Sequence, residues 1–441
     1  MAARTRYAIV GTGGRSAIYS AALLGEYADR AELVALCDTN SRRMSYWNSQ
    51  FKAEHGKGPV STYFAHEFDT MVASSKPDVV IVTSIDRTHH RYICRAMELG
   101  CDAISEKPMT VDAAKCQQIL DTIERTGRKL RVTFNYRYAP RNSAVRRVLA
   151  EGAIGRVLSV HFEWILDTTH GADYFRRWHR DKRNSGGLMV HKATHHFDLM
   201  NWWLQAAPEN VFGYGDLKFY GRENAENRGA TSFYSRVHDQ AAAQGDPFAL
   251  RLQGNPKLEG LYLNAESEDG YHRDQSVFGD GISIEDDMAL VVRYDTGAVM
   301  SYHLHAYAPW EGYAVNFNGT KGRLEVFVAE KGYVSASTSD PHAPEGRAIA
   351  SDDQTSIVVR PHWGAPYAVD FDDAHGGHGG GDTRMLRDIF TGVSDDPLGR
   401  AATHVDGARS ILTGIAANQS FRTGLPVDVR TLVRLPGAEA R

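Results

Sequence analysis

The chain has 441 residues, of which 42% are hydrophobic and 24% charged, and its formal net charge is −4. This composition excludes a mainly disordered chain, and the near-neutral charge gives the protein no electrostatic reason to bind nucleic acid or an anionic membrane. The length exceeds what one compact core accommodates, and two large domains fit it. No stretch approaches the ~18 apolar residues that a transmembrane helix needs.

The amino-terminal residues lead directly into a strand-like run, without the apolar stretch and cleavage site of a signal peptide. None of the four cysteines forms a C-x-x-C pair. We therefore expect reduced thiols, rather than disulfides or a zinc–cysteine cluster, and a cytoplasmic protein. The cysteines are Cys37, Cys94, Cys101 and Cys116.

Short apolar runs alternate with polar segments of helical length over the first 135 residues. Strands that alternate with helices indicate a parallel sheet, and continuous apolar character is typical of strands buried on both faces. We predict an α/β domain over residues 1–135. Its expected strands are 7–10, 33–37, 79–82, 103–105 and 130–134.

A glycine-rich turn, Gly11-Thr12-Gly13-Gly14-Arg15-Ser16, directly follows the first strand. Such a turn lets the backbone approach a pyrophosphate at a helix N-terminus, although Ser16 replaces the usual third Gly or Ala. Asp38 ends the second strand, where an acid accepts hydrogen bonds from the adenosine ribose. The combination predicts a dinucleotide cofactor; the alternative is a plain glycine turn with Asp38 as a helix N-cap.

Asp38 also bears on the type of cofactor. Its carboxylate repels a 2′-phosphate, which favours NAD, whereas Arg42 and Arg43 leave NADP as the less favoured alternative. Thr39 and Arg42 join the predicted cofactor contacts on this side.

The pattern changes after about residue 156. Alternating runs predict strands with one wet face, so we expect an α+β domain over residues 136–441. The segment 212–284 is rich in Gly and polar residues, and we expect it to be a long insertion that wraps the surface or covers a cleft. The strands are expected at 157–164, 288–294, 298–305, 322–328 and 426–429, and the helices at 191–204, 383–391 and 403–423.

Glu106-Lys107-Pro108, together with Thr83-Ser84, His89 and the glycine turn, resembles the Gfo/Idh/MocA family (glucose–fructose oxidoreductase, inositol 2-dehydrogenase, rhizopine catabolism). The resemblance extends over nearly the whole chain, including Asn135 and the segment 178–187. It implies a Rossmann domain followed by an α+β domain with a large, open, mainly antiparallel sheet. It also implies oxidation or reduction of a carbinol carbon on a sugar, cyclitol or glycoside, and a homodimer or homotetramer formed through the open sheet.

The resemblance assigns roles to single residues. Lys107 matches the lysine near the reacting hydroxyl, and a cis bond before Pro108 is one option for that turn. Trp178 matches a tryptophan that reaches the cofactor from the second domain. His195 matches the substrate-helix histidine, whereas His191 stands where the family has an acid. The residues matched to the loops around the cofactor are Thr83, Ser84, His89 and Glu106.

Three of these side chains suit the chemistry of hydride transfer, which needs a base for the hydroxyl proton. Lys107 can be that base if burial and nearby cations lower its pKa; otherwise it is a surface lysine. His195 is a proton acceptor near neutral pH or a core histidine. His191 can act as a base in place of the acid or bind a sugar hydroxyl. At positions i and i+4, His191 and His195 share a helix face, which is also a metal geometry, but no third ligand has a recognisable spacing, so we predict no metal.

The segment 170–180 is dense in aromatic and hydrogen-bonding side chains, as a carbohydrate wall would be; the alternative is a solvated basic loop. Residues after the sixth strand can line the same cleft, because ligands of open α/β sheets lie beyond the strand C-termini. The predicted substrate contacts are Tyr136, Arg137, Tyr174, Arg177, His179 and Lys192.

Three functions remain open at this point. The leading one is an NAD-dependent dehydrogenase for a carbohydrate-like small molecule. The second is a glycoside hydrolase that uses NAD transiently, through oxidation, elimination, hydration and re-reduction, with extra proton transfers made by histidines. The third is a non-catalytic NAD-binding sensor.

Overall fold

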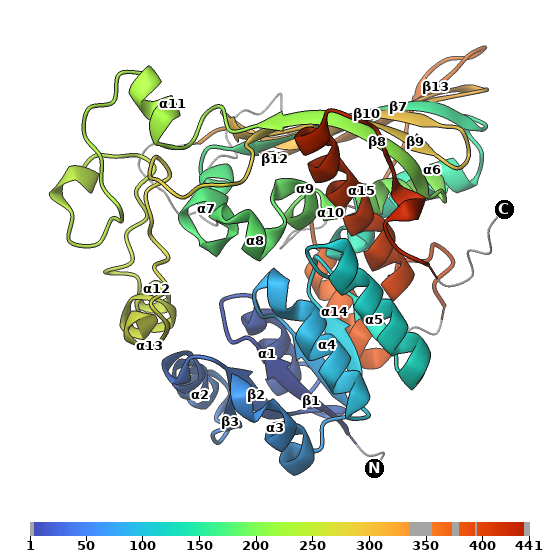
Figure 1. The fold of residues 1–441 in the computed structure, drawn as a ribbon. Helices are drawn as coiled ribbons and strands as arrows, with labels where there is room; N and C mark the ends of the chain where they lie inside the picture. The colour runs from blue at the N-terminus through green and yellow to red at the C-terminus, as the bar shows by residue number, and fades with distance from the viewer. Residues whose placement is uncertain (1–3, 335–354, 373–378, 393–394, 436–441) are drawn as a thin grey trace.

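Two sheets organise the chain in this computed structural model, which describes residues 4–334, 355–372, 379–392 and 395–435. A six-stranded sheet is built from the first third of the chain, and a nine-stranded sheet from the rest. Figure 1 shows the two sheets at opposite ends of the molecule, with helices α7 to α10 and α15 between them. No helix of the described part of the chain is long and apolar enough to span a bilayer.

The first sheet has the strand order β3-β2-β1-β4-β5-β6, and every pairing is parallel. The order reverses between β1 and β4, which is where open α/β sheets bind their ligands. The five predicted strands are confirmed, and β3 is an addition whose largely exposed side chains carry no apolar signal. The strands are β1 Thr5–Val10, β2 Ala31–Asp38, β3 Ser61–Phe64, β4 Val79–Val82, β5 Asp102–Ser105 and β6 Leu130–Val132, and the helices are α1 Ser16–Leu24, α2 Ser41–His55, α3 Phe68–Ser75, α4 His89–Glu98 and α5 Ala113–Thr126.

The second sheet has the order β14-β13-β12-β11-β7-β10-β9-β8-β15. Strands β7 and β10 run parallel, and the other described pairings are antiparallel. The expectation of a large, mainly antiparallel sheet is therefore confirmed. The strands are β7 Val157–Asp167, β8 Pro208–Asp216, β9 Asp287–Tyr294, β10 Val299–Ala308, β11 Glu311–Gly319, β12 Gly322–Lys331, β13 Ser356–Pro361, β14 Tyr367–Ala368 and β15 Val427–Asp428.

One face of this sheet is covered by helices and the other is open. Buried and exposed positions alternate along β9 and β12, as in a sheet with one wet face. The covering helices include α6 Pro140–Ala150, α9 Leu188–His191, α10 Thr194–Leu204 and α15 His404–Thr423. The open face and its edges carry the exposed apolar residues Leu158, Tyr214, Val291 and Val299.

The helix predicted over 191–204 is confirmed from Thr194 to Leu204, but its predicted start is wrong, because His191 ends a separate short helix, α9. Gly187, at a φ of +76°, precedes α9, which ends at His191. The amide of Ala193 then bonds the carbonyl of Leu188, five residues back, instead of continuing the regular pattern. His191 and His195 thus lie on different helices.

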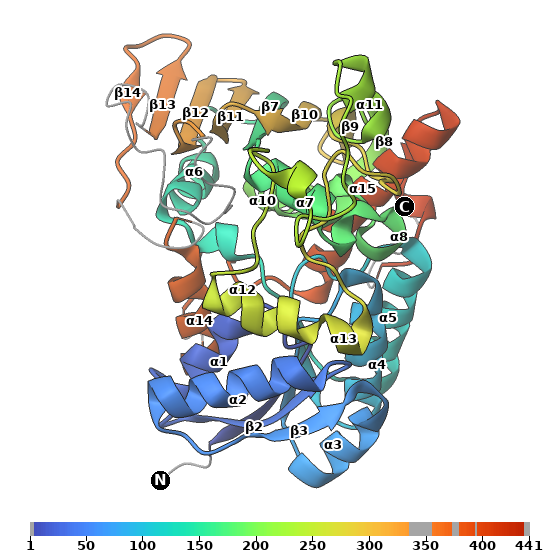
Figure 2. The same cartoon turned by 90° about the vertical axis from the view of Figure 1, so that its left-hand side faces the viewer.

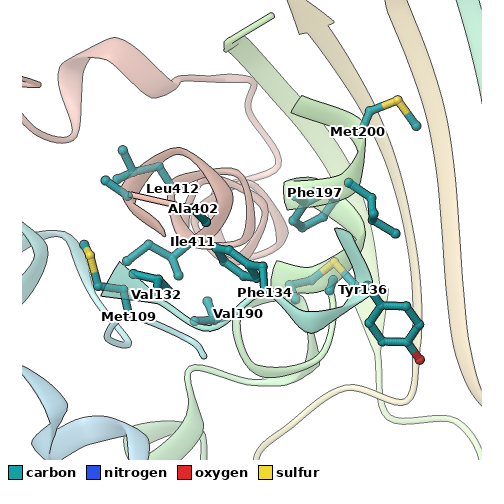
Figure 3. Packing of buried hydrophobic residues seen from close by; sticks show 14 of the residues in the cluster. Met109, Val132, Phe134, Tyr136, Val190, Phe197, Met200, Ala402, Ile411 and Leu412 are labelled. Atoms are coloured by element: carbon teal, nitrogen blue, oxygen red, sulfur yellow. The ribbon is translucent and has the colours of Figure 1, made fainter. Parts of the chain in front are cut away.

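A shared apolar core joins the two domains, as Figure 3 shows. Val132 and Phe134 come from β6 and the residues after it, and they belong to the same buried cluster as Val190 and Phe197 of α9 and α10. Ile411 of α15 completes this part of the cluster. The two domains are therefore joined by one continuous packed core.

Two segments of the second domain return to the first sheet. Helix α14 (Gly381–Thr391) places Phe390 within 5.3 Å, between ring centroids, of Tyr7 and Tyr27. The segment 256–269, with α12 Pro256–Leu261, η6 Leu263–Ala265 and α13 Glu266–Asp269, lies along α2 (Figure 2). The insertion is shorter than predicted, because residues 212–216 belong to β8; it also contains α11 Arg222–Asn227.

Candidate active site

The glycine turn follows β1 and ends where α1 begins, at Ser16. Gly11 has a φ of +89°, and a Cβ there would lie 2.4 Å from the Ser84 backbone nitrogen, so only glycine fits. A Cβ at Gly13 would meet no atom within 4 Å. The open space over Gly13, beside the N-terminus of α1, fits a pyrophosphate.

Asp38 holds the glycine turn in place. Its Oδ2 accepts hydrogen bonds from the Thr12 backbone nitrogen and hydroxyl at 2.5 and 2.9 Å, and its Oδ1 accepts from the Thr39 hydroxyl at 3.3 Å. Asn40, and not Asp38, is the N-cap of α2, since its side chain accepts from the Arg43 amide at 3.2 Å. The N-cap alternative for Asp38 is therefore wrong, and the carboxylate lies at the carboxyl end of β2, where a ribose would bind.

The loops matched to the cofactor lie directly beneath this turn. The Thr83 hydroxyl donates to the Gly11 carbonyl at 2.5 Å. His89 places its ring nitrogens 2.9 and 2.8 Å from the carbonyl oxygens of Ser84 and Pro108, and thereby ties two loops together. The Lys107–Pro108 peptide bond is cis.

Glu106 and Arg15 pair beneath the loop, with the Arg15 Nε donating to Glu106 Oε1 at 2.7 Å. The Tyr19 hydroxyl donates to the same oxygen at 2.7 Å, and Arg15 also reaches Asp382 at 3.2 Å. Burial alone would raise the pKa of Glu106, but Arg15 holds it below its usual range. Both residues therefore support the loops around the cofactor through charge.

Lys107, His191 and Asp86 form a hydrogen-bonded chain. Lys107 Nζ donates to His191 Nε2 at 3.3 Å and to the His191 carbonyl at 3.2 Å, and His191 Nδ1 donates to Asp86 Oδ2 at 2.5 Å. The bond to Asp86 fixes which imidazole nitrogen carries the proton, and leaves Nε2 as the acceptor facing Lys107. Asp86 follows β4, so the chain connects the two domains.

Burial governs the protonation of this chain. It lowers the pKa of Lys107 to about 8 and raises the pKa of Asp86 well above its usual range. Burial and the neighbouring Lys107 charge hold the pKa of His191 well below the ordinary value. Burial therefore favours the uncharged form of each of the three groups, an amine, an imidazole and a carboxyl group.

Aromatic side chains from α7 (His170–Arg176) and η4 (Trp178–Arg180) surround His191. His179 stacks on Trp178 at 3.6 Å between ring centroids and meets His191 edge-on at 4.1 Å. Tyr174 lies 5.5 Å from His191 in the same sense. Arg177 borders this group and bonds Asp173 at 3.2 Å. The structure thus brings the predicted wall residues beside Lys107.

A second hydrogen-bonded chain starts from the same wall. The Tyr174 hydroxyl lies 3.1 Å from His170 Nε2, and His170 Nδ1 lies 2.7 Å from Glu311 Oε1. Burial alone would raise the pKa of Glu311, but the adjacent His170 lowers it to about 2. The Glu311 carboxylate is therefore charged and is joined to the Tyr174 hydroxyl through His170.

His195 packs among aromatic rings outside the Lys107–His191–Asp86 group. Its ring packs edge-on against Tyr136 at 4.9 Å and Phe134 at 6.0 Å, between centroids. Lys192 places its Nζ 5.1 Å from the centre of the Trp164 ring and 6.0 Å from that of Tyr136. Burial lowers the pKa of Lys192, as it does for Lys107. His195 and Lys192 therefore form one cluster with the aromatic rings of Tyr136, Phe134 and Trp164.

Arg137 is placed away from any substrate contact. Its side chain is 2% exposed and bonds Asp198 through Nε at 2.8 Å and Nη2 at 2.6 Å, and Asp406 at 3.1 Å. The interpretation of Arg137 as a substrate contact is therefore wrong, because all of its charge is used inside the protein. A sequence shows an arginine after a strand but not the two distant acids that bind it.

Asp86, His179 and His191 could also be considered as metal ligands, since one ligand atom of each lies within 4.8 Å of the others. The charge around them opposes this use: Lys107 is hydrogen-bonded to His191, and Lys107 and Arg177 both act on the pKa of His179. A cation at this place would meet two others in a buried site. The absence of a metal stays a prediction.

Two hollows lie beside the insertion. One, of about 700 Å³, is lined by residues 216–218, 221–224 and 279–282 and contains none of the predicted site residues. The other, of about 490 Å³, is lined by Trp178, Arg180 and Tyr271, among others. The second hollow therefore opens next to the aromatic wall, while Asp86 and His191 lie deeper.

Sequence reasoning missed Asp86, Glu311 and Tyr262. Asp86 had a usable signal, because it follows the predicted strand 79–82 at the ligand-binding edge of the sheet. Glu311 lies more than a hundred residues from its partner His170, and the Tyr262 hydroxyl accepts from the Gly14 amide at 3.3 Å from within the insertion. No local pattern reveals such contacts.

The geometry agrees with comparisons to known proteins. The model of the NAD-binding Rossmann domain of the Gfo/Idh/MocA oxidoreductase family matches residues 5–134, and that of its C-terminal α/β domain matches residues 146–429. "Putative oxidoreductase YteT" of Bacillus subtilis is 34% identical over 435 residues, covering 94% of this chain and 95% of the relative. "Inositol 2-dehydrogenase" of Rubrobacter xylanophilus is 26% identical over 215 residues, covering 47% and 55% of the two chains.

The fold also matches solved structures. The crystal structure of the WlbA dehydrogenase from Bordetella pertussis, in complex with NADH and UDP-GlcNAcA, superimposes with a TM-score of 0.61 at 17% identity. The match covers 97% of this chain and 99% of that one, so the two share their whole architecture.

Proposed function

This chain belongs to the Gfo/Idh/MocA family of oxidoreductases, and we propose that it transfers a hydride between NAD and a secondary hydroxyl of a sugar, cyclitol or glycoside. The observation that supports this most directly is the chain from Lys107 through His191 to Asp86, 3.3 and 2.5 Å per step, beside the glycine turn. Bound at that turn, NAD supplies the nicotinamide that takes or gives the hydride.

The residues of the chain divide the remaining work. Lys107, with a pKa near 8, takes the proton of the substrate hydroxyl. His191 Nε2 accepts a hydrogen bond from the Lys107 amine while the charge of that amine changes. Asp86 orients His191 and balances the charge that develops. Tyr174 and His179 exclude water and offer the aromatic and polar edges that carbohydrates bind. His195, Tyr136 and Lys192 line the neighbouring base of the cleft.

The test is the absorbance of reduced nicotinamide when the protein, NAD and a panel of sugars, cyclitols and glycosides are mixed. We expect a turnover signal with at least one member, and its loss in Lys107→Met. Lys115→Met is the matched control, because Lys115 pairs with Asp112 at 2.6 Å, outside the site. Silence of the wild type across a wide panel, with NAD bound, would contradict net dehydrogenation.

A glycoside hydrolase with transient redox chemistry is the second candidate, and the Tyr174–His170–Glu311 chain favours it. Elimination and hydration need proton transfers beyond the one that Lys107 makes, and a second chain in the same wall can supply them. This function predicts aglycone release at substoichiometric NAD without accumulation of NADH. A requirement for one NAD per turnover would exclude it. A non-catalytic sensor would instead keep its NAD-dependent signal in Lys107→Met.

We propose further that residues 1–135 bind the dinucleotide and that residues 136–441 bind substrate and form a homodimer or homotetramer. The support for the oligomer is the open sheet face with Leu158, Val291 and Val299, since exposed apolar faces of this kind associate. Light scattering of Leu158→Glu against the wild type tests this, with dissociation expected. The four cysteines are buried free thiols, which agrees with the proposed cytoplasmic location.

A further inference from the structure

The insertion reaches the cofactor side of the first domain and is fixed there. Leu261 is fully buried in the apolar cluster that contains Met44 and Trp47 of α2. Arg43 donates to the Leu261 carbonyl through Nε at 3.0 Å and to Asp269 through Nη1 at 2.6 Å. Figure 2 shows the segment 256–269 lying along α2, and the buried Leu261 and the bonds from Arg43 hold it there.

Glu268 of this segment binds the first turn of α2. Its Oε2 accepts from the backbone nitrogens of Ser41 and Arg42 at 2.6 and 3.4 Å. Its Oε1 accepts from the Ser41 hydroxyl at 2.7 Å and lies 3.6 Å from the Arg42 Nε. One carboxylate thus occupies the free amides of a helix N-terminus and the arginine beside it.

These are the groups that a 2′-phosphate would use. In a dinucleotide site of this type the acid at the end of β2, here Asp38, serves the ribose, and a nearby arginine accommodates the extra phosphate of NADP. Free amides at a helix N-terminus also bind phosphate. In this chain Glu268 holds both partners, so a 2′-phosphate would face two carboxylates and find Arg42 neutralised.

We infer that Glu268 is a specificity-determining residue, which selects NAD over NADP by occupying the 2′-phosphate position from the second domain. The inference rests on the proposed function, because it requires that the glycine turn bind a dinucleotide. The insertion thereby contributes to the choice of cofactor. Asp38 alone would reject the 2′-phosphate only in part, because Arg42 would still be free to bind that phosphate.

Calorimetric titration of the purified, nucleotide-stripped full chain with NAD and with NADP tests this. Glu268→Gln keeps the size of the side chain and an oxygen for Ser41, but removes the charge. We expect its Kd for NADP to fall about tenfold while its Kd for NAD stays within about threefold. Glu268→Ala should act in the same direction, and adding Arg42→Ala should cancel the gain. Glu266→Gln is the control, because Glu266 pairs with Arg236 at 2.6 Å instead.

The outcomes separate the two proposals. If NAD binds and Glu268→Gln leaves the ratio of the NADP and NAD dissociation constants unchanged, this inference is wrong and the proposed function stands. A wild type that binds NADP as tightly as NAD overturns it as well. If the wild type binds neither dinucleotide, both proposals fall. Far-ultraviolet circular dichroism of each variant confirms that the comparison is made between folded proteins.

Discussion

His191 and Asp86, 105 positions apart in the chain, are joined by a 2.5 Å hydrogen bond between Nδ1 and Oδ2. The bond crosses between the domains, and it orients an imidazole whose other nitrogen faces Lys107. A carboxylate that fixes the tautomer of a histidine is a recurring device in proton-transfer sites. The protonation of Lys107 therefore depends on a residue outside the sequence motifs.

Replacing Asp86 by Asn keeps the size of the side chain but removes its negative charge. The Asp86 charge raises the pKa of Lys107, so Asp86→Asn should lower that pKa and shift the pH dependence of oxidation to lower pH. We expect kcat to fall about 10–100-fold because the histidine loses the carboxyl group that orients it, with little change in the Kd for NAD. The pH profile of kcat/KM measures this, and Asp112→Asn on the surface is the control. A pH profile that does not shift would argue against a role for the Lys107–His191–Asp86 hydrogen bonds.

The wild-type enzyme should show the titration of Lys107. Its amine must be neutral to take a proton, and its pKa is about 8, so kcat/KM for oxidation should rise as the pH increases to about 8 and then level off. Lys107→Met should lose this limb and about 10²–10⁴-fold in rate. A flat profile between pH 6 and 9 in the wild type would mean that another group is the base.

Two glycine substitutions test the dinucleotide turn. Gly13→Ala should leave the free energy of unfolding unchanged, because a Cβ there meets no atom within 4 Å, yet weaken NAD binding at least about tenfold by filling the space for the pyrophosphate. Gly58→Ala, which also meets no atom within 4 Å, should affect neither. Denaturant unfolding and calorimetric titration give the two quantities, and normal NAD binding by Gly13→Ala would place the cofactor elsewhere.

Arg137→Met tests whether Arg137 supports the fold or contacts the substrate. Asp198 would remain buried without its partner, which should lower the free energy of unfolding by about 3–5 kcal/mol. At a temperature where the variant is folded, KM should stay near the wild-type value, since Arg137 touches no substrate. Urea unfolding and steady-state kinetics measure both. Arg183→Met, an exposed arginine paired with Asp181, should leave stability unchanged. A stable Arg137→Met with a raised KM would restore the substrate role.

Chelation should leave the activity intact. Asp86, His179 and His191 lie close enough to bind an ion, but the positive charges of Lys107 and Arg177 oppose it. We expect no change in kcat after treatment with EDTA and dialysis, and less than one equivalent of zinc by elemental analysis. Reversible loss of activity on chelation would contradict this and turn the three residues into ligands.

The sequence predicted what local patterns encode. Buried parallel strands have continuous apolar runs, so five of the six strands of the first sheet were found, and β3 was missed because its side chains are largely exposed. The structure places Lys107 and Tyr174 next to His191, and their roles in a site stay a prediction. The break between α9 and α10 depends on one carbonyl, that of Leu188, and leaves no mark in the composition. Arg137, Glu311 and Glu268 acquire their roles from partners more than sixty residues away.

Helix α14 is synthesised late but packs on the first domain. The first sheet emerges from the ribosome long before residues 381–391, yet Phe390 covers Tyr7 and Tyr27, Asp388 binds Arg131, and Asp382 binds Arg15. Until that helix is made, Tyr7 and Tyr27 lack the cover of Phe390 and Arg131 lacks its ion pair with Asp388, whereas Arg15 still has Glu106 as a partner. The nucleotide-binding half therefore completes its packing only after residues 381–391 have been synthesised, and a chaperone could act on it until then.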